Sequence, residues 1–283
     1  MRLVRYGSVG HERPGLIDND ERVRDLSAHI ADLDGSALSV DKLKQLTALQ
    51  IADLPLVEGE PRLGPPVARP SKFIAIGLNY RDHAEEAGLP IPAEPIIFSK
   101  AVSSIQGAFD PVVIPPGSKK TDWEIELGVV IGTRASFVSK ETALEHVAGY
   151  LLVNDVSERE YQLERGGTWD KGKGCDSFGP IGPWLVTSDE IPDPQALDMR
   201  LAVNGVERQR GNTSTMIFDV PTIVSYVSQF ISLEPGDIIA TGTPPGVGMG
   251  IRPEPVFLRE GDVMELSIDR LGVQRQTLIP FAR

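Results

Sequence analysis

From residue 72 onward, short apolar runs alternate with turns rich in glycine and proline. Examples are KFIAIG at 72–77, WEIELGVVIG at 123–132 and AGYLLVND at 148–155. Runs of this length, bounded by glycine and proline, are typical of β-strands. Helical patterns are few, and they span 141–147, 157–166 and 220–231. The pattern predicts an α+β fold that is mostly β, with many short strands in a mixed β-sandwich or roll.

Two details of this region predict local structure. Asn204-Gly205, flanked by alternating residues, predicts a two-residue hairpin turn. The helix over 220–231 has an apolar stripe that ends at Phe230 and Ile231, which predicts packing against the core. Strands and helices do not alternate regularly, as they would in a TIM barrel or a Rossmann domain. No GxGxxG or Walker sequence follows a strand, which argues against a nucleotide.

The N-terminal part of the chain has a different composition. Residues 41–50 have the pattern of a short amphipathic helix, with Ser39 or Asp41 as its cap. The segment VEGEPRLGPPVARP at 57–70 contains four prolines and no periodicity, which is typical of a connector. We therefore expect a small N-terminal domain and linker at 1–68 and a larger catalytic domain at 69–283.

Charge and cysteine content restrict the classes of partner. The net charge of −12 argues against nucleic acid and against anionic membrane surfaces, both of which attract basic proteins. No apolar run is long enough to span a bilayer, and the first residues lack a signal-peptide pattern, so we expect a cytoplasmic protein. The one cysteine, Cys175, leaves no pair for a disulfide within the chain and no cysteine-based zinc site. Its position in a glycine-rich loop gives little reason to expect a nucleophile.

Two glutamates lie two positions apart inside an apolar strand pattern. Because side chains alternate faces along a strand, Glu124 and Glu126 point to the same side, away from Ile125 and Leu127. Two carboxylates about 4 Å apart repel each other by roughly 4 kcal/mol at an effective dielectric constant near 20. The pair is either a solvated strand face or part of a site for a hard divalent cation.

A third carboxylate follows at the end of the run AGYLLVND. Asp155 stands where a strand gives way to a polar segment, a position that also suits a turn or a helix cap. Together with Glu124 and Glu126, it would supply three oxygen ligands from two strands. Such a set suits Mg²⁺ or Mn²⁺ and leaves positions for water and substrate. No HxH or HExxH spacing favours zinc instead.

The sequence GLNYRDHAEEAG at 77–88 predicts a strand end followed by a short helical turn. In that turn His83 and Glu86 are three residues apart and therefore neighbours on one helix face. A carboxylate beside an imidazole fixes its tautomer and raises its basicity, as a general base for water requires. The alternative is an exposed pair on a surface helix, which is common by chance.

Two further loops offer polar groups. The loop RGGTWDKGKGCDSFGPIGPW presents Lys171 and Lys173 near Trp169, and its glycines permit a close approach to a ligand. A lysine that reaches an acidic pocket would stay charged and stabilise an oxyanion, whereas most loop lysines are only solvated. The turn in GDIIATGTPPGVGMG carries Thr241 and Thr243, whose hydroxyls suit a carboxylate.

Taken in order, these segments resemble the fumarylacetoacetate hydrolase superfamily. The resemblance covers about 72–283 and rests on NYRDHAEEAG, EPIIFSK, WEIELGVVIG, the aspartate of LLVND, WDKGK and GDIIATGTPPGVG. The branch that looks most similar is that of the 2,4-diketo-3-deoxy-L-fuconate (or L-rhamnonate) hydrolases, which share GGTWDKGKGCDSFGPIGPWLVT, DPQALDM and TSTMIF. Near relatives have often been labelled ureidoglycolate lyase. The resemblance implies a mixed β-sandwich roll in a homodimer.

The resemblance also implies roles for individual residues. Residues that match the metal ligands are Glu124, Glu126 and Asp155, with Mg²⁺ usual and Mn²⁺ an alternative. The water-activating dyad matches His83 and Glu86 on a lid, and the pocket lysine matches Lys173, four residues after Trp169, in preference to Lys171. Residues that match those holding the 2-oxo acid are Arg159, Gln162 and Thr243.

These roles predict a hydrolase that acts on a carbon–carbon bond. The expected substrate is an acylpyruvate, with 2,4-diketo-3-deoxy-L-fuconate or L-rhamnonate giving pyruvate and lactate in sugar catabolism. The metal would act as a Lewis acid and template, and His83 would activate water. The alternatives on the same site are an oxaloacetate decarboxylase, a hydroxymuconate isomerase, a ureidoglycolate lyase-like enzyme, and a binder of oxo acids without turnover.

Overall fold

The computed structural model describes residues 1–282 and contains one large mixed sheet. Nine of its strands run in the order β3-β2-β1-β14-β11-β10-β17-β5-β6, while β4, β7 and β13 pair off this path. These strands are β1 (Arg2–Tyr6), β2 (Arg13–Ile17), β3 (Val23–Asp25), β4 (Leu63–Gly64), β5 (Phe73–Gly77), β6 (Ile96–Lys100), β7 (Ile105–Gly107), β10 (Ile125–Ile131), β11 (Val147–Asn154), β13 (Gly179–Ile181), β14 (Leu185–Thr187) and β17 (Ile238–Ala240).

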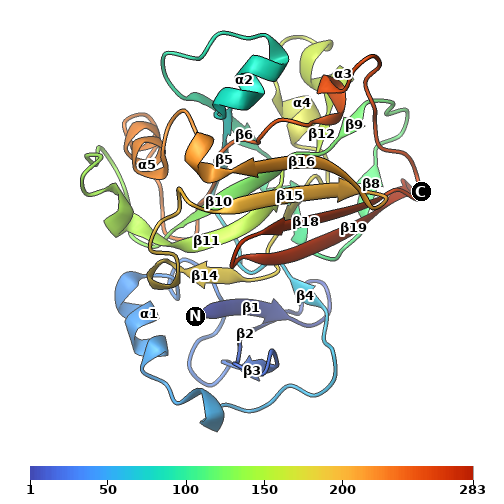
Figure 1. Cartoon of the computed structure of the whole chain (residues 1–283). Helices are drawn as coiled ribbons and strands as arrows, with labels where there is room; N and C mark the ends of the chain where they lie inside the picture. The colour runs from blue at the N-terminus through green and yellow to red at the C-terminus, as the bar shows by residue number, and fades with distance from the viewer. Residues whose placement is uncertain (283) are drawn as a thin grey trace.

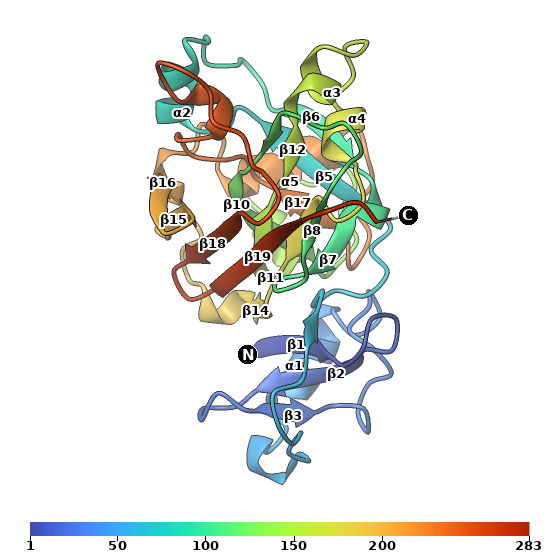
Figure 2. The same cartoon turned by 90° about the vertical axis from the view of Figure 1, so that its right-hand side faces the viewer.

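A second, five-stranded sheet lies across one face of the large sheet, as Figure 2 shows. Its strands, in spatial order, are β16 (Val206–Asn212), β15 (Asp198–Val203), β18 (Val263–Ile268), β19 (Gly272–Pro280) and β8 (Val112–Ile114). Asn204 and Gly205 join β15 to β16 with φ of 52° and 75°, so the predicted hairpin turn is confirmed. A short ladder joins β9 (Thr121–Asp122) to β12 (Ser157–Glu158).

Helices are short. They are α1 (Val40–Thr47), α2 (Arg81–Ala87), α3 (Arg159–Leu163), α4 (Asp170–Lys173) and α5 (Val220–Ser228), with 3₁₀ turns η1 (Ile51–Asp53), η2 (Val102–Ser104), η3 (Ala143–His146), η4 (Ser188–Glu190), η5 (Thr213–Thr215) and η6 (Gly248–Gly250). The predicted α+β fold with mostly β structure is confirmed. Figure 1 shows α2, α3 and α4 together at one end of the molecule. Among residues 1–282, none of the helices is long and apolar enough to cross a lipid bilayer.

Strand β10 is the centre of the fold and is buried on both faces. Leu127, Val129 and Ile131 pack into the core between the two sheets, whereas Val130 packs into a second core on the opposite face. A strand covered on both faces reads as a continuous apolar run, as this one does. Glu126 has the same parity as Val130, so it points away from the core between the sheets.

The predicted helices form with different bounds. Ser39 caps α1 by accepting a hydrogen bond from the N–H of Lys42, which confirms one of the two caps considered. The segment over 141–147 forms only a 3₁₀ turn, because β11 begins at Val147 and pairs with β10. Helix α5 ends at Ser228, and Phe230 is 66% exposed, so its assignment to the core was wrong.

The N-terminal strands extend the large sheet. Strand β1 pairs with β14 over Arg2–Val186 and Leu3–Leu185, and it also pairs with β2 and β4. Figures 1 and 2 show this segment at the end of the molecule opposite α2 and α3. The N-terminal segment therefore extends the large sheet at β14 and lies far from the side chains considered below.

Candidate active site

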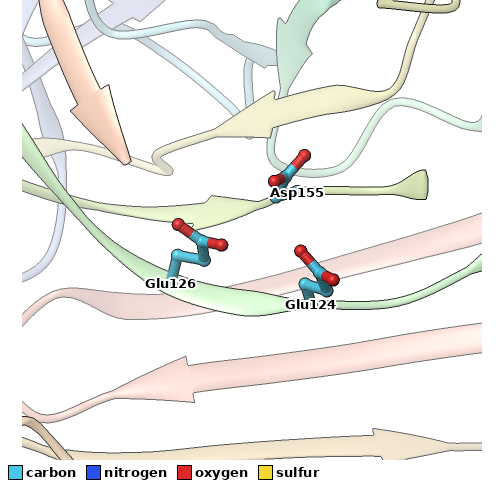
Figure 3. Close-up of side chains that lie close together, drawn as sticks. All are labelled: Glu124, Glu126 and Asp155. Atoms are coloured by element: carbon cyan, nitrogen blue, oxygen red, sulfur yellow. The ribbon is translucent and has the colours of Figure 1, made fainter. Parts of the chain in front are cut away.

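Two of the predicted carboxylates come from the start of β10. Glu124 and Glu126 are buried, at 7% and 2% exposure, so a solvated strand face is excluded. Each offers an oxygen atom that lies within 4.8 Å of the other and of an Asp155 oxygen. Figure 3 shows the two glutamates pointing from the same side of their strand toward Asp155. The period-two argument from the sequence therefore placed these two side chains correctly.

Asp155 reaches the glutamates because β11 is the antiparallel partner of β10. Ile125 is opposite Asn154 in this ladder, so the residue after Asn154 lies beside Glu124. The backbone N–H of Asp155 donates to the carbonyl of Glu124 at 2.8 Å. Asp155 is fully buried. Two adjacent strands thus bring together three carboxylates that are separated by up to 31 positions in the sequence.

Of the two loop lysines considered from the sequence, Lys173 is the one that enters this cluster. It is the last residue of α4, and its Nζ donates to Glu124 Oε2 and to Asp155 Oδ2, both at 2.6 Å. Burial alone lowers the pKa of Lys173, but the charges of Asp155 and Glu124 outweigh it, so the pKa lies above its usual value. Lys171, by contrast, is exposed and donates to the carbonyl of Arg165.

Arg159 contacts the same cluster from the start of α3. Its guanidinium donates to Glu124 Oε1 at 2.7 Å, to Asp122 Oδ2 at 2.9 Å and to Gln162 Oε1 at 3.0 Å. Burial raises the pKa of Glu124. The positive charges of Lys173 and Arg159 lower it by a larger amount, so the net pKa is well below the usual range. Glu124 therefore stays ionised, and Arg159 fixes the orientation of Gln162 through its carbonyl oxygen.

Glu126 has a different environment. Its Oε2 accepts a hydrogen bond from the backbone N–H of Gly242 at 2.7 Å. Burial and the charges of Asp155 and Glu124 raise the pKa of Glu126 well above its usual value. Without a cation the ionised form of Glu126 is therefore disfavoured, and a bound divalent cation would stabilise it.

The donor set of the cluster fits a hard divalent cation. All three side chains offer carboxylate oxygen, the ligand that Mg²⁺ and Mn²⁺ prefer. Each carboxylate has about four lone-pair sites, so its oxygens can accept a hydrogen bond and also coordinate a cation. Lys173 and Arg159 occupy part of this capacity on Glu124, and capacity remains on all three residues. The residues present are thus compatible with the metal site predicted from the sequence.

The predicted pair on α2 lines the same cavity as Glu124 and Glu126. His83 Nδ1 lies 3.0 Å from Glu86 Oε2, so the carboxylate fixes the proton on Nδ1 and leaves Nε2 as the acceptor. Glu86 also accepts hydrogen bonds from the N–H of Gly246 at 3.0 and 3.1 Å. Burial raises the pKa of Glu86, but the hydrogen bonds from His83 and Gly246 lower it, and the net shift is downward. Glu86 is therefore a charged orienting group for His83.

Gly246 holds this contact because no other residue suits its position. Its φ is +102°, and a Cβ would lie 1.9 Å from the carbonyl oxygen of Arg208. This loop, between β17 and η6, also contains Thr243. Glycine thus lets the loop pack closely against β16, in a conformation that directs its backbone N–H at Glu86.

Thr243 lines the cavity, and its hydroxyl also contacts the segment that carries Glu124 and Glu126. It donates to the carbonyl of Ile125 and accepts from Gln209 Nε2, each at 2.8 Å. Gln209 Oε1 in turn accepts from the N–H of Ile125 at 3.0 Å. Both backbone groups of the residue between the two glutamates are therefore held by side chains. Thr243, Gln209 and Ile125 therefore form one hydrogen-bonded unit.

Sequence reasoning missed Lys100, at the end of β6. It is 2% exposed, and its Nζ donates to Asp155 Oδ1 at 2.6 Å, to the carbonyl of Val156 at 3.3 Å and to the carbonyl of Lys173. Burial lowers its pKa despite the charge of Asp155. Lys100 therefore connects the carboxylate of Asp155 to the backbone of Lys173. In the sequence, the position of this lysine at the end of the apolar run EPIIFSK was the one sign that it could enter the site.

Replacing Lys100 with methionine should lower the free energy of unfolding by about 3–5 kcal/mol, because it leaves Asp155 with a buried charge that has lost a partner. Excess Mg²⁺ should restore part of this loss by supplying positive charge. Urea unfolding with EDTA and with Mg²⁺ measures both effects. Lys119→Met, at an exposed position, is the matched control. Equal losses in the two variants would contradict the role given to Lys100.

Comparison with known proteins gives the class of this chain. Residues 72–279 match the family model described as Fumarylacetoacetate (FAA) hydrolase C-terminal. This is more than half of the chain and includes all the side chains described in this subsection. The chain belongs to the fumarylacetoacetate hydrolase family.

Individual relatives cover the full length. A Burkholderia ambifaria protein, provisionally named as a hydrolase, is 61% identical over 277 residues, 98% of each chain. The structure of maleylpyruvate hydrolase from Sphingobium sp. SYK-6, in complex with manganese (II) ion and pyruvate, is 30% identical with a TM-score of 0.82. That of 2-hydroxyhepta-2,4-diene-1,7-dioate isomerase from Mycobacterium marinum is 30% identical with a TM-score of 0.76. Both structures cover 100% of each chain, so the similar proteins include hydrolases and an isomerase.

Proposed function

We propose that this chain is a metal-dependent hydrolase that cleaves the carbon–carbon bond of acylpyruvates, which are 2,4-diketo acids. The observation that carries the proposal is a single cavity lined by Glu124, Glu126 and Lys173 and also by His83 and Glu86. A cation site and a water-activating base in one cavity are what this hydrolysis needs. The related protein in complex with manganese (II) ion and pyruvate supports the same class of product.

Glu124, Glu126 and Asp155 would hold the cation, either Mg²⁺ or Mn²⁺. When bound, such an ion supplies Lewis-acid chemistry by polarising substrate oxygens and stabilising negative charge on them. Arg159 and Lys173 already neutralise Glu124 and Asp155 in part, whereas Glu126 retains a raised pKa. We expect Glu126 to respond most strongly to the ion.

His83 would act as the general base. Its Nδ1 is engaged by Glu86, so Nε2 accepts a proton from a water molecule in the cavity. That water attacks the carbonyl at carbon 4 of the substrate. Base catalysis of this kind contributes about 10²–10⁴-fold to the rate. The contact of Glu86 with Gly246 keeps the imidazole in place.

Cationic and amide groups would hold the pyruvate half. Lys173 and Arg159 are buried beside the carboxylates, and Gln162 directs its carbonyl oxygen to Arg159, which leaves its amide N–H groups for the substrate. A buried ammonium group stabilises charge that develops on substrate oxygens. Thr243 lines the same cavity, and because its hydroxyl proton is already donated to the carbonyl of Ile125, it would contact the carboxylate end through its backbone N–H.

The reaction balances without a further co-reactant. Water adds to carbon 4, the bond between carbons 3 and 4 breaks, and its electron pair passes to carbon 3 as the enolate of pyruvate. The enolate takes one proton at carbon 3, and the acyl group leaves as a carboxylic acid. Protonated His83 or Lys173 returns the proton. With 2,4-diketo-3-deoxy-L-fuconate or its L-rhamnonate counterpart, the products would be pyruvate and lactate.

One alternative has a specific observation in its favour. The related isomerase shows that this fold also serves a reaction without hydrolysis. An isomerase needs a base that moves a proton between carbon atoms, whereas a hydrolase needs an oriented base for water. The His83–Glu86 pair favours the hydrolase, since it orients Nε2 through Nδ1. An oxaloacetate decarboxylase or a binder without turnover would not need this pair.

The test is incubation with 2,4-diketo-3-deoxy-L-fuconate and Mg²⁺, with and without EDTA, with pyruvate as the measured product. Oxaloacetate serves as a parallel substrate. Metal-dependent release of pyruvate and lactate would support the hydrolase. Pyruvate from oxaloacetate alone would favour the decarboxylase instead, and no product from either substrate or from acetylpyruvate would contradict the proposal.

A further inference from the structure

The wall of the active-site cavity changes from charged to apolar along its length. The cavity has a volume of about 340 Å³. Its inner, charged part consists of Glu124, Glu126, Arg159 and Lys173. Much of the remaining wall is apolar and comes from β6, α3, the segment before α4 and the loop after β17; its main side chains are Ile96, Phe98, Leu163, Trp169, Val247 and Met249.

The apolar wall begins directly beside the charged part. The Lys173 ammonium lies 5.2 Å from the centroid of the Phe98 ring, and this ring packs edge to face against Trp169 with centroids 5.1 Å apart. Gly77 makes room for Trp169, because a Cβ at Gly77 would lie 2.7 Å from the indole Cζ3. The aromatic pair is therefore held in position next to the reacting groups.

Apolar side chains also surround the mouth of the cavity. Leu89, Ile96, Leu163 and Met249 are 53%, 38%, 48% and 36% exposed, and they line this cavity from four separate segments of the chain. Clustered exposed apolar surface around a cavity marks a place where an apolar group binds. An acyl chain that leaves the charged part would cover these side chains.

The polar side chains of this outer part are largely engaged. His83 and Glu86 contact each other, and Glu86 contacts Gly246. Arg252 is exposed, and its Nη1 donates to the carbonyl groups of Met249, Gly250 and Ile251. Hydroxyl groups on the acyl part would therefore meet mainly apolar surface, whereas a second carboxylate would have a cationic partner in this outer part, the exposed guanidinium of Arg252.

We propose that the preferred substrates are acylpyruvates whose acyl group is apolar and larger than acetyl, with the acyl chain lying along Phe98, Trp169 and Ile96. This inference rests on the proposed function and adds the substrate class. A cavity of about 340 Å³ is within the range of sites that hold drug-sized ligands. The short, hydroxylated acyl group of a diketo sugar acid would fill only its inner part.

The test compares kcat/KM for hexanoylpyruvate, acetylpyruvate, fumarylpyruvate and 2,4-diketo-3-deoxy-L-fuconate with saturating Mg²⁺. Hexanoylpyruvate should exceed acetylpyruvate by at least about tenfold, since its acyl chain has four additional methylene groups and burial of each contributes about fourfold. Ile96→Ser should reduce the hexanoyl-to-acetyl ratio by at least about fourfold, the effect of one buried methylene. Val273→Ser, at a 52% exposed position on β19, is the matched control and should leave the ratio unchanged.

The results test the apolar subsite and the hydrolase separately. Turnover of acetylpyruvate with no gain for hexanoylpyruvate would overturn the apolar subsite and leave the hydrolase standing. Highest activity on fumarylpyruvate would also overturn it and would point to Arg252 as the partner of a second carboxylate. If no acylpyruvate is cleaved, the proposed hydrolase fails, and calorimetric affinities for hexanoylpyruvate and acetylpyruvate then decide whether the apolar subsite exists.

Discussion

Exchange of Glu126 for glutamine should weaken the binding of Mn²⁺ by more than about 100-fold. Loss of a residue that only hydrogen-bonds to a metal ligand typically lowers metal affinity by about 10–100-fold, and loss of a ligand itself should lower it more. Glutamine keeps the size of the side chain and the contact with the N–H of Gly242. It removes the charge that a divalent cation would neutralise. Titration calorimetry with Mn²⁺ measures the effect directly, without any substrate.

The same variant should not lose stability when metal is removed. Burial and the charges of Asp155 and Glu124 raise the pKa of Glu126, so its ionised form is disfavoured in the folded chain. Neutral glutamine removes this unfavourable term, and the midpoint of thermal unfolding in EDTA should stay equal or rise. The stabilisation by excess Mn²⁺, about 2.7 kcal/mol at 100 times the dissociation constant, should disappear.

Glu265→Gln is the control for this experiment, since Glu265 lies on β18 with a side chain that is 50% exposed. It should bind Mn²⁺ as the unchanged chain does. Equal Mn²⁺ affinity in Glu126→Gln and in the control would show that Glu126 is not a ligand. A lower unfolding midpoint of Glu126→Gln in EDTA would contradict the account of its buried charge.

Local periodicity predicted the common face of Glu124 and Glu126, whereas it left Asp155 open between a cation ligand and a turn or helix cap until the family resemblance was considered. The spacing of Glu124 and Glu126 sets a common face, and Asp155 lies at the end of the next apolar run, which becomes the neighbouring antiparallel strand. Similarly, the i, i+3 spacing of His83 and Glu86 predicted a contact that the structure shows at 3.0 Å. These predictions depend on neighbours in sequence or in one hairpin-like ladder, so they need no knowledge of the tertiary fold.

Contacts over long sequence distances were not predictable in the same way. Lys100 meets Asp155 across 55 positions, and Gln209 meets Ile125 across 84 positions. Neither residue has a spacing that identifies its partner. Helix bounds failed for a related reason: pairing with β10 turns Val147 into a strand residue, although ETALEHV has a helical pattern. Tertiary pairing thus decided what local preference left open.

The role of the dyad can be separated from that of the metal site by a second variant, His83→Asn. It should lower kcat for acylpyruvate hydrolysis by about 10²–10⁴-fold, because asparagine cannot take a proton from water. Affinity for Mn²⁺ should stay unchanged, since His83 contacts Glu86 and is not among the clustered carboxylates. Pyruvate release and calorimetry on the same preparation measure the two quantities.

Glu85→Gln provides the control, because Glu85 is an exposed residue on the same helix, α2. It should keep the full rate, whereas Glu86→Gln should give an intermediate loss as the imidazole loses its charged partner. A His83→Asn chain with normal hydrolysis and normal Mn²⁺ binding would remove water activation from α2. The cavity would then keep the cation site, Lys173 and Arg159 but no base for water, and a decarboxylase, which needs no such base, would explain the site better than a hydrolase.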